Sequence, residues 1–288
     1  MNKVAIVTDS SASLPPELIK QYEIKVLPLL LHLEGETYKD RIDIKTPAEL
    51  FELVKKASEF PTTSAPPPGE FVEVYRQLSR KVNSILTLTM SSVLSMTFGS
   101  ATQAREVVKS ELPDINIEVF DSRSTTGGLG LMVLAAARAA ASGQNMPAVI
   151  KAAEDVRSKI NHLYVFDTLS YLARSGRISK AAAMAGNILS MKPITEMPTS
   201  LGRAVVVARP RTKKKALQVL LEMVRDRVKT DEPLHVLVEH VCAAEEAERL
   251  KGIVQGQFNC AEVLLCEYSP ISSLIVGPGV VGLSCYQG

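Results

Sequence analysis

The hydrophobic and polar positions of the first half of the chain follow one repeating pattern. Short continuous apolar runs, typical of strands covered on both faces, alternate with amphipathic segments that carry helix signals. The pattern predicts strands at 4–7, 84–88 and 115–121, with further strand and turn over 24–40. It predicts helices at 15–22, 46–57, 70–81, about 100–112 and 129–141. This alternation favours a mostly parallel α/β sheet.

The pattern changes after about residue 158. Strands are predicted over 162–169, 203–211, 233–241, 261–269 and 272–276, and helices over 179–189, 212–229 and 243–257. This order is typical of an α+β unit, and 288 residues are enough for two ordinary domains. We therefore expect an N-terminal α/β domain, 1–158, and a C-terminal α+β domain, 159–288.

Small hydroxyl side chains gather where predicted strands end. The stretch TLTMSSVLSMTFGSA, 87–101, passes from a buried strand to a helix and supplies Ser91, Ser92, Ser95 and Thr97. A second group lies in 61–69, whose prolines predict a loop, and consists of Thr62, Thr63 and Ser64.

The positions of these loops suggest a ligand site. Loops 8–13, 91–95 and 121–128 fall at the carboxyl ends of predicted strands, where parallel sheets bind their ligands. Hydroxyls and helix N-termini both donate hydrogen bonds to a carboxylate. Two hydroxyl loops that converge on one helix start would therefore hold a carboxylate without a cation. The alternative is that the hydroxyls only cap the helix.

Composition excludes several other classes of function. A net charge of +2 does not point to nucleic acid, and the four cysteines form no C-x-x-C pair that would indicate zinc or a redox dithiol. No histidine or acidic spacing typical of a metal site is present, so we expect neither metal nor cofactor. The most apolar stretch, 129–141, is too short to span a bilayer. No signal peptide is recognised, and we expect a cytoplasmic protein.

Other motifs leave alternatives open. GPGVVG at 277–282 matches a dinucleotide fingerprint only weakly, and a turn that lets backbones approach closely is the preferred interpretation. A serine-dependent acyl hydrolase using Ser92 or Ser95 is the competing function, although no G-x-S-x-G elbow is present. Two basic segments, 173–183 and 209–216, contain Arg177 and Arg211, whose side chains would bind a phosphate or an acidic partner. Local salt bridges and a solvated surface remain the alternatives for these basic residues.

Seven motifs, in order along nearly the whole chain, resemble those of the DegV family of bacterial fatty-acid-binding proteins. They are IVTDSSASLP, PTTSAPPPGEF, SSVLSMTF, VFDS, TLSYLARSGRIS, MKPI and GPGVVGL. The resemblance implies two domains with a long-chain fatty acid between them. It implies that Thr63 and Ser95 bind the carboxylate, and we expect Ser64 and Ser92 beside them. The expected function is that of a carrier rather than an enzyme.

The resemblance also implies a partner. Some family members present the fatty acid to a kinase subunit that makes acyl phosphate, and an arginine, here Arg177, and a histidine are implicated in that role. Isoleucine stands at the histidine position, Ile275, and cannot hydrogen-bond an acyl phosphate. We therefore expect the protein to bind fatty acid normally but to support acyl-phosphate formation by a kinase subunit poorly, unless Arg203 or Arg211 replaces the histidine. Two further departures are Ser175, in place of a glycine, and Met96, which we expect to narrow the pocket.

Overall fold

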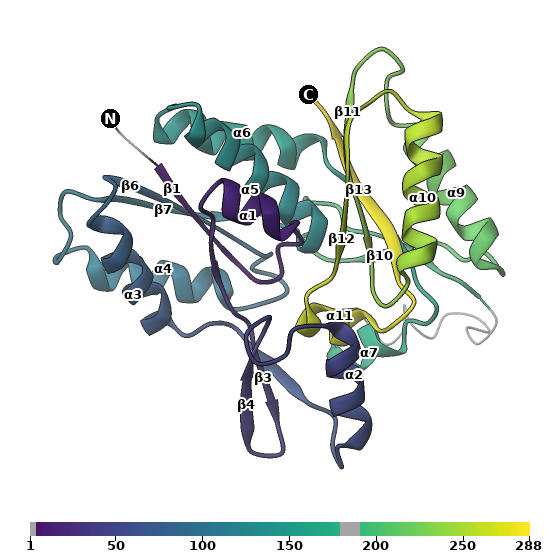
Figure 1. Cartoon of the computed structure of the whole chain (residues 1–288), viewed down its shortest axis with the longest axis horizontal. Helices are drawn as coiled ribbons and strands as arrows, with labels where there is room; N and C mark the ends of the chain where they lie inside the picture. The colour runs from purple at the N-terminus through teal and green to yellow at the C-terminus, as the bar shows by residue number, and fades with distance from the viewer. Residues whose placement is uncertain (1–3, 179–190) are drawn as a thin grey trace.

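The computed structural model describes residues 4–178 and 191–288, which form three β-sheets and their covering helices (Figure 1). The first sheet is entirely parallel and has the order β2-β1-β6-β7. Its strands are β1 (Val4–Asp9), β2 (Lys25–Leu27), β6 (Ser84–Thr89) and β7 (Asn116–Asp121). The parallel sheet predicted for the first half of the chain is thus confirmed.

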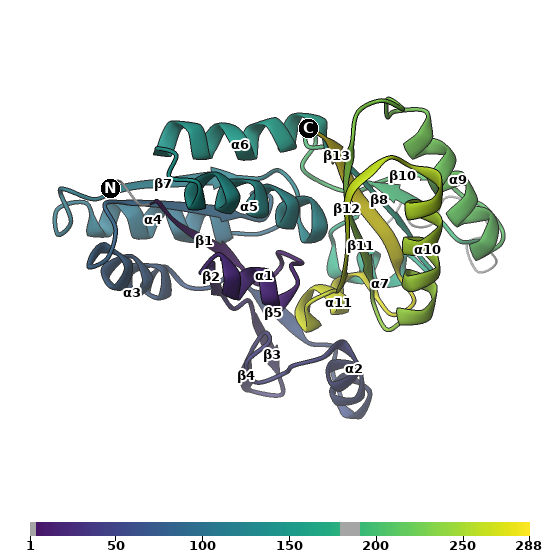
Figure 2. The ribbon, with the colours of Figure 1, turned by 45° about the horizontal axis from the view of Figure 1, so that its top comes forward.

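Helices cover both faces of this sheet because both faces are apolar. Val4 and Ile6 of β1 pack toward α1 (Pro16–Gln21), α5 (Thr126–Ala141) and α6 (Met146–Lys159). Val7 and Ile85 point the other way, toward α3 (Pro68–Ser79) and α4 (Thr97–Val108). Figure 2 shows the two helical layers with the sheet between them. The alternation of side chains along a strand fixes this three-layer arrangement.

The second sheet has six strands in the order β10-β9-β8-β13-β11-β12. Only β11 and β12 pair in parallel; the other neighbours are antiparallel. Helices α9 (Lys213–Arg225) and α10 (Ala244–Gln257) cover one face. The strands are β8 (Asn161–Val165), β9 (Ile194–Glu196), β10 (Val205–Ala208), β11 (Leu234–His240), β12 (Cys260–Glu267) and β13 (Val281–Gln287). The α+β character of this half is confirmed, and the exact boundary at 158/159 stays a prediction.

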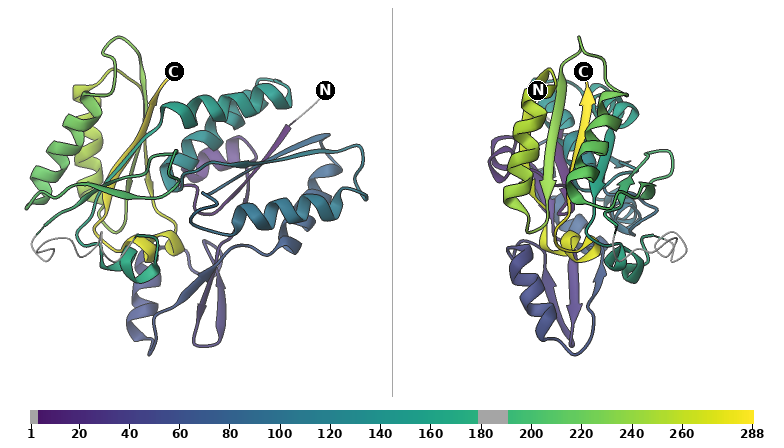
Figure 3. Two further views of the ribbon diagram at one scale, coloured as in Figure 1. Left: turned by 180° about the vertical axis from the view of Figure 1, so that it is seen from behind. Right: turned by 90° about the vertical axis from the view of Figure 1, so that its right-hand side faces the viewer.

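A small third sheet, β4-β3-β5, projects from the rest of the molecule beside α2 (Figure 3). Its strands are β3 (Leu30–Leu33), β4 (Glu36–Lys39) and β5 (Thr62–Ser64), and α2 spans Pro47–Lys56. The prediction of a loop over 61–69 is therefore wrong at β5 and at the start of α3. Prolines flank β5 but do not interrupt it, and β5 is an edge strand, where neighbouring prolines are tolerated.

Another prediction is corrected near the C-terminus. Residues 272–276 are not a strand but belong to helix α11 (Pro270–Val276). Ser269 caps this helix by accepting a hydrogen bond from Ser272 N at 3.2 Å, and Pro270 occupies the first turn. A short helix α7 (Ser170–Ser175) was also not predicted. The helix predicted over 179–189 lies outside the described residues.

Helix α5 joins the two large sheets. It packs on the parallel sheet through Leu129 and Met132, and the same apolar cluster includes Leu237 of β11 in the second sheet. Its glycines allow this close contact: a Cβ on Gly130 would lie 2.3 Å from the carbonyl oxygen of Ser13. A helix that is apolar all round is a buried helix. Within the described ranges, neither α5 nor any other helix is long and apolar enough to cross a membrane.

The contact at Gly130 predicts a sharp difference between two glycine substitutions. Gly130→Ala should lower the free energy of unfolding by about 1–3 kcal/mol, because backbone must move to admit the methyl group. Gly252→Ala is the matched control, because Gly252 lies on the exposed face of α10, where a Cβ meets nothing within 4 Å. That change should raise stability by up to about 1 kcal/mol through helix propensity. Urea unfolding of both variants measures this, and equal stability would contradict the packing described for α5.

Candidate functional site

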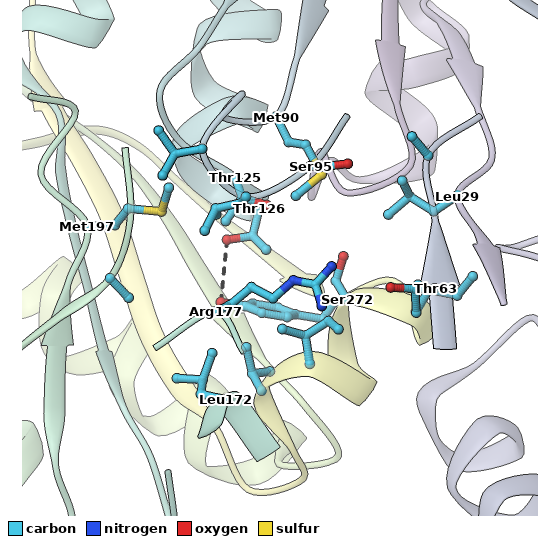
Figure 4. A pocket seen from close by; sticks show the side chains of 18 of the residues that line it. Leu29, Thr63, Met90, Ser95, Thr125, Thr126, Leu172, Arg177, Met197 and Ser272 are labelled. Atoms are coloured by element: carbon cyan, nitrogen blue, oxygen red, sulfur yellow. Dashed lines mark hydrogen bonds between the residues drawn. The ribbon is translucent and has the colours of Figure 1, made fainter. Parts of the chain in front are cut away.

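A cavity of about 590 Å³ lies where the three sheets meet (Figure 4). The small sheet, the loop after β6 and the N-terminus of α5 line one side, and β8, β9, α7 and α11 line the other. Much of the lining is apolar and includes Leu29, Met90, Phe166, Leu172, Met197 and Ile271. Of the residues predicted for the site, the cavity is lined by Thr63, Ser64, Ser92, Ser95 and Arg177.

Thr63 reaches the cavity because β5 pairs with β3. Leu31 of β3 is its register partner, and neighbouring side chains on β5 point to opposite faces. Ser64 accordingly contacts His32 on β3, with 2.8 Å between Ser64 Oγ and His32 Nε2. Figure 4 shows the hydroxyl of Thr63 directed into the cavity. The geometry thus favours Thr63 over Ser64 as a hydrogen-bond donor to a ligand.

The two serines of the loop after β6 differ in what they contact. Ser92 donates to Asp121 Oδ2 at 2.5 Å, and its backbone N–H donates to Oδ1 of the same carboxylate at 3.1 Å. Ser95 Oγ lies 2.9 Å from Thr97 Oγ1. One hydroxyl proton is enough for the Ser95–Thr97 bond, so this pair has a second proton to donate. Ser95 is therefore the better donor to a ligand.

These contacts also bear on the acyl-hydrolase hypothesis. A nucleophilic serine needs a base that takes its proton. Within the described residues, the side-chain contacts of Ser92 and Ser95 are to Asp121 and to Thr97, and neither serine contacts a histidine. The arrangement therefore favours binding over acyl transfer.

The loop at 8–13 has a structural role. Asp9 accepts hydrogen bonds from Ser11 Oγ at 2.5 Å and from Met90 N at 2.8 Å, which ties the ends of β1 and β6 together. Asp40 accepts from Ser10 Oγ at 2.6 Å and from Ile271 N at 3.1 Å. Burial raises the pKa of both carboxyls. Loops 91–95 and 121–128 contribute to the cavity lining, whereas 8–13 holds neighbouring elements in place.

The basic candidates are placed differently from one another. Arg177 lines the cavity, and its Nη1 donates to the carbonyl of Ser175 at 2.6 Å. A second hollow of about 580 Å³ shares Arg177 with the cavity and is also lined by Arg203 and Arg209. Arg211 is exposed and is not among the residues that line either hollow.

The two apolar departures from the family pattern also reach the cavity. Ile275 lies on α11 in the cavity lining. Met96 lines the cavity too, but 73% of it is exposed, so it lies at the mouth. Whether Met96 narrows the pocket for a ligand stays a prediction.

One wall of the cavity is polar, and the sequence patterns did not reveal it. Its residues come from α5, β8, β9 and the end of β12: Thr125, Thr126, His162, Tyr164, Thr195 and Tyr268. Behind them lies the buried Glu239, which accepts from Gly127 N at 2.9 Å and from Tyr164 OH. The segment around β8 is mostly apolar in sequence, so its pattern did not reveal that the side chains alternate between two faces. This alternation places His162 and Tyr164 on the same face of the sheet.

Comparisons with known proteins can now be set beside this geometry. Residues 3–288 match the model of a family described as "Uncharacterised protein, DegV family". The chain belongs to the DegV family. It is 36% identical over 226 residues to a DegV domain-containing protein of Caldanaerobacter subterraneus, covering 78% of each chain. It is 30% identical to protein DegV of Bacillus subtilis, covering 99% of each chain.

Solved DegV structures share the fold. A DegV family protein from Thermus thermophilus, described by its fatty acid binding, superposes with a TM-score of 0.90 at 31% identity and covers 99% of this chain and 100% of its own. DegV of Bacillus subtilis, described as a fatty acid binding protein, gives 0.88 at 29% identity and covers 100% of both chains. The two-part α/β architecture of this DegV protein is therefore that of its relatives.

The buried Glu239 predicts a pH dependence of stability. Burial raises the pKa of this carboxyl from 4.5 to about 8. Between these values the folded protein keeps a proton that the unfolded chain has lost, so the contribution of Glu239 to stability falls as the pH rises. Glu239→Gln should remove that fall, and its stability relative to the parent should increase from pH 5 to pH 8. Urea unfolding at both pH values measures the difference.

Glu245→Gln is the control for this experiment, because the side chain of Glu245 is 94% exposed. It should leave the pH dependence as in the parent. A constant difference between Glu239→Gln and the parent at both pH values would show that Glu239 does not titrate in this window.

Proposed function

We propose that this protein binds a long-chain fatty acid in the cavity and acts as a carrier. The observation that carries the proposal is a cavity with hydroxyl donors, Thr63 and Ser95, beside apolar walls. The fatty acid binding described for the Thermus thermophilus and Bacillus subtilis relatives supports it. In this proposal, Thr63 and Ser95 bind the carboxylate, and the acyl chain lies in the cavity, which forms a tunnel between the two halves.

Physical magnitudes assign different roles to the tail and the head group. Burial of each CH₂ group contributes about 0.8 kcal/mol, so a dozen buried carbons give on the order of 10 kcal/mol before the cost of association. A hydrogen bond to a charged group contributes about 1.5–3 kcal/mol. The tail therefore sets most of the affinity. The hydroxyls set the direction in which the acid enters.

We further propose that the carrier presents its acid to a kinase subunit in the cytoplasm. Arg177 supports this role, because it lines both the cavity and the neighbouring basic hollow. Ile275 works against it, because its side chain cannot neutralise an acyl phosphate. Arg203 is better placed than Arg211 to compensate, since only Arg203 shares the second hollow with Arg177.

The binding proposal predicts bound lipid and a defined head-group site. Extraction of the purified protein followed by mass spectrometry should yield a long-chain fatty acid. Ser95→Ala and Thr63→Val should each weaken palmitate binding by about 1.5–3 kcal/mol, since each removes a donor to a charged group. Their effects should not add, because both donors share one carboxylate. Calorimetric titration of delipidated protein measures these affinities.

Thr62→Val is the matched control, since Thr62 lies on the same strand as Thr63 with its side chain on the opposite face. It should bind as the parent does. Protein that carries no lipid and takes up neither palmitate nor oleate would contradict the proposed function. Unchanged affinity in both site variants would place the carboxylate elsewhere.

The kinase proposal predicts a poor acyl-phosphate donor. With a fatty acid kinase subunit and ATP, the parent should form acyl phosphate slowly, and Ile275→His should accelerate it about tenfold or more by adding one hydrogen bond to a charged group. Ile275→Leu is the control and should behave as the parent. Rapid turnover by the parent, unchanged in Ile275→His but lost in Arg203→Ala, would assign the role to Arg203 instead.

A further inference from the structure

The polar wall of the cavity begins with the alternation along β8. Leu163 and Val165 point toward α9 and α10 and belong to the apolar cluster there. His162, Tyr164 and Phe166 line the cavity on the other face. Thr195 of β9 is the register partner of Tyr164 and lines the cavity beside it. A fatty acid would thus pass a wall that is neither a head-group site nor purely apolar.

A chain of hydrogen bonds runs behind this wall from Glu239 to His162. Glu239 Oε2 accepts from Gly127 N and contacts the hydroxyl of Tyr164. The oxygen of Tyr164 lies 3.0 Å from Ser284 Oγ, and Ser284 Oγ lies 3.2 Å from His162 Nδ1. Each hydroxyl has one proton, and the buried carboxyl of Glu239 keeps a proton that it can donate, so the chain can run in either direction. In both directions Nδ1 of His162 is bonded to Ser284.

The second nitrogen of His162, Nε2, takes no part in this chain. The imidazole is neutral, because burial lowers its pKa to about 3. Nδ1 faces α5, where a Cβ on Gly128 would lie 2.6 Å from it. Among the described residues no partner contacts Nε2, and this atom is not sealed in protein as the unpartnered Glu239 Oε1 is. Nε2 is the ring nitrogen left for the cavity side, and it needs a hydrogen-bond partner there.

We propose that His162 Nε2 forms a hydrogen bond with a hydroxyl group on the acyl chain, which can donate or accept, so that the cavity prefers a hydroxy fatty acid whose hydroxyl reaches this point. This inference rests on the proposed fatty-acid function. His162 is only 4% exposed, and a polar nitrogen buried against an acyl chain is costly when it has no hydrogen-bond partner. A saturated hydrocarbon chain supplies no such partner.

The hydroxyl would lie away from the carboxylate. The carbonyl of His162 accepts from Met197 N at 3.0 Å, which places the histidine next to Met197. Figure 4 shows Met197 and Thr63 at opposite sides of the cavity, with Thr125 and Thr126 between them. A 2-hydroxy acid held by Thr63 and Ser95 would therefore keep its hydroxyl at the head group. A hydroxyl further along the chain is the group that meets His162.

Positional isomers provide the test, because they have equal length and equal polarity. Delipidated protein is titrated by calorimetry with stearate and with 2-, 3-, 10- and 12-hydroxystearate. One isomer with its hydroxyl away from the carboxylate should bind about threefold to tenfold tighter than the other isomers, as expected for one net hydrogen bond. His162→Phe should abolish the difference between isomers and retain binding of stearate.

His235→Phe is the matched control, since His235 stacks on Tyr286 and is not among the residues that line the cavity. It should keep the isomer preference of the parent. Isomers that bind the parent with equal affinity, or a preference that survives in His162→Phe, would overturn the inference and leave fatty-acid binding intact. The comparison within the parent protein needs no variant. Failure of stearate and all isomers to bind would instead overturn the proposed function and this inference together.

Discussion

The packing of α5 between the two large sheets is the constraint on which the rest of the molecule depends. The helix can lie this close only because Gly127, Gly128 and Gly130 present no side chains to Glu239, His162 and the backbone of Ser13. The same packing brings the N-terminus of α5, with Thr125 and Thr126, to the cavity wall. The cavity is therefore a consequence of how the two halves are joined, and not a feature of one half alone.

Three buried carboxyls hold the strands and loops around the cavity and α5. Asp9 and Glu239 are fully buried carboxyls, and Asp40 is nearly so, and burial raises the pKa of each. Each one accepts hydrogen bonds from elements distant in sequence, as Asp40 does from Ser10 and Ile271. Buried polar groups of this kind cost stability unless they are paired, but they specify one arrangement of the loops around a cavity. Because no side chains fill the cavity, packing alone does not fix the loops around it, and the hydrogen bonds to these carboxyls do so.

Local patterns in the sequence predicted many of the elements, but they did not lead to α6 or β13. The buried parallel strands β1 and β6 are mostly apolar runs in the sequence. Thr46 and Pro47 correctly predicted the start of α2, as its cap and its first residue. The sequence did not predict β5, since a three-residue strand exists only because β3, some thirty residues earlier, pairs with it. Thr63 and Ser95 came from motifs that resemble a family, and their assignment to a carboxylate remains a proposal. The role proposed for His162 could not be found this way, because it depends on contacts with Ser284, Tyr164 and Glu239.

The two halves contribute different chemistry to the same cavity. Thr63, Ser95 and the start of α5 belong to the first half and provide hydrogen-bond donors. The second half contributes side chains of three kinds: the cation Arg177, the apolar Ile275 and the imidazole of His162. A bound acid would contact both halves. Its binding to the folded protein alone would raise the free energy of unfolding, in addition to the contribution of the α5 packing. A change at Ile275 alters what the second half offers to a phosphate without altering the donors for the carboxylate. In the proposed function, binding of an acid and its delivery to a partner would therefore be separable.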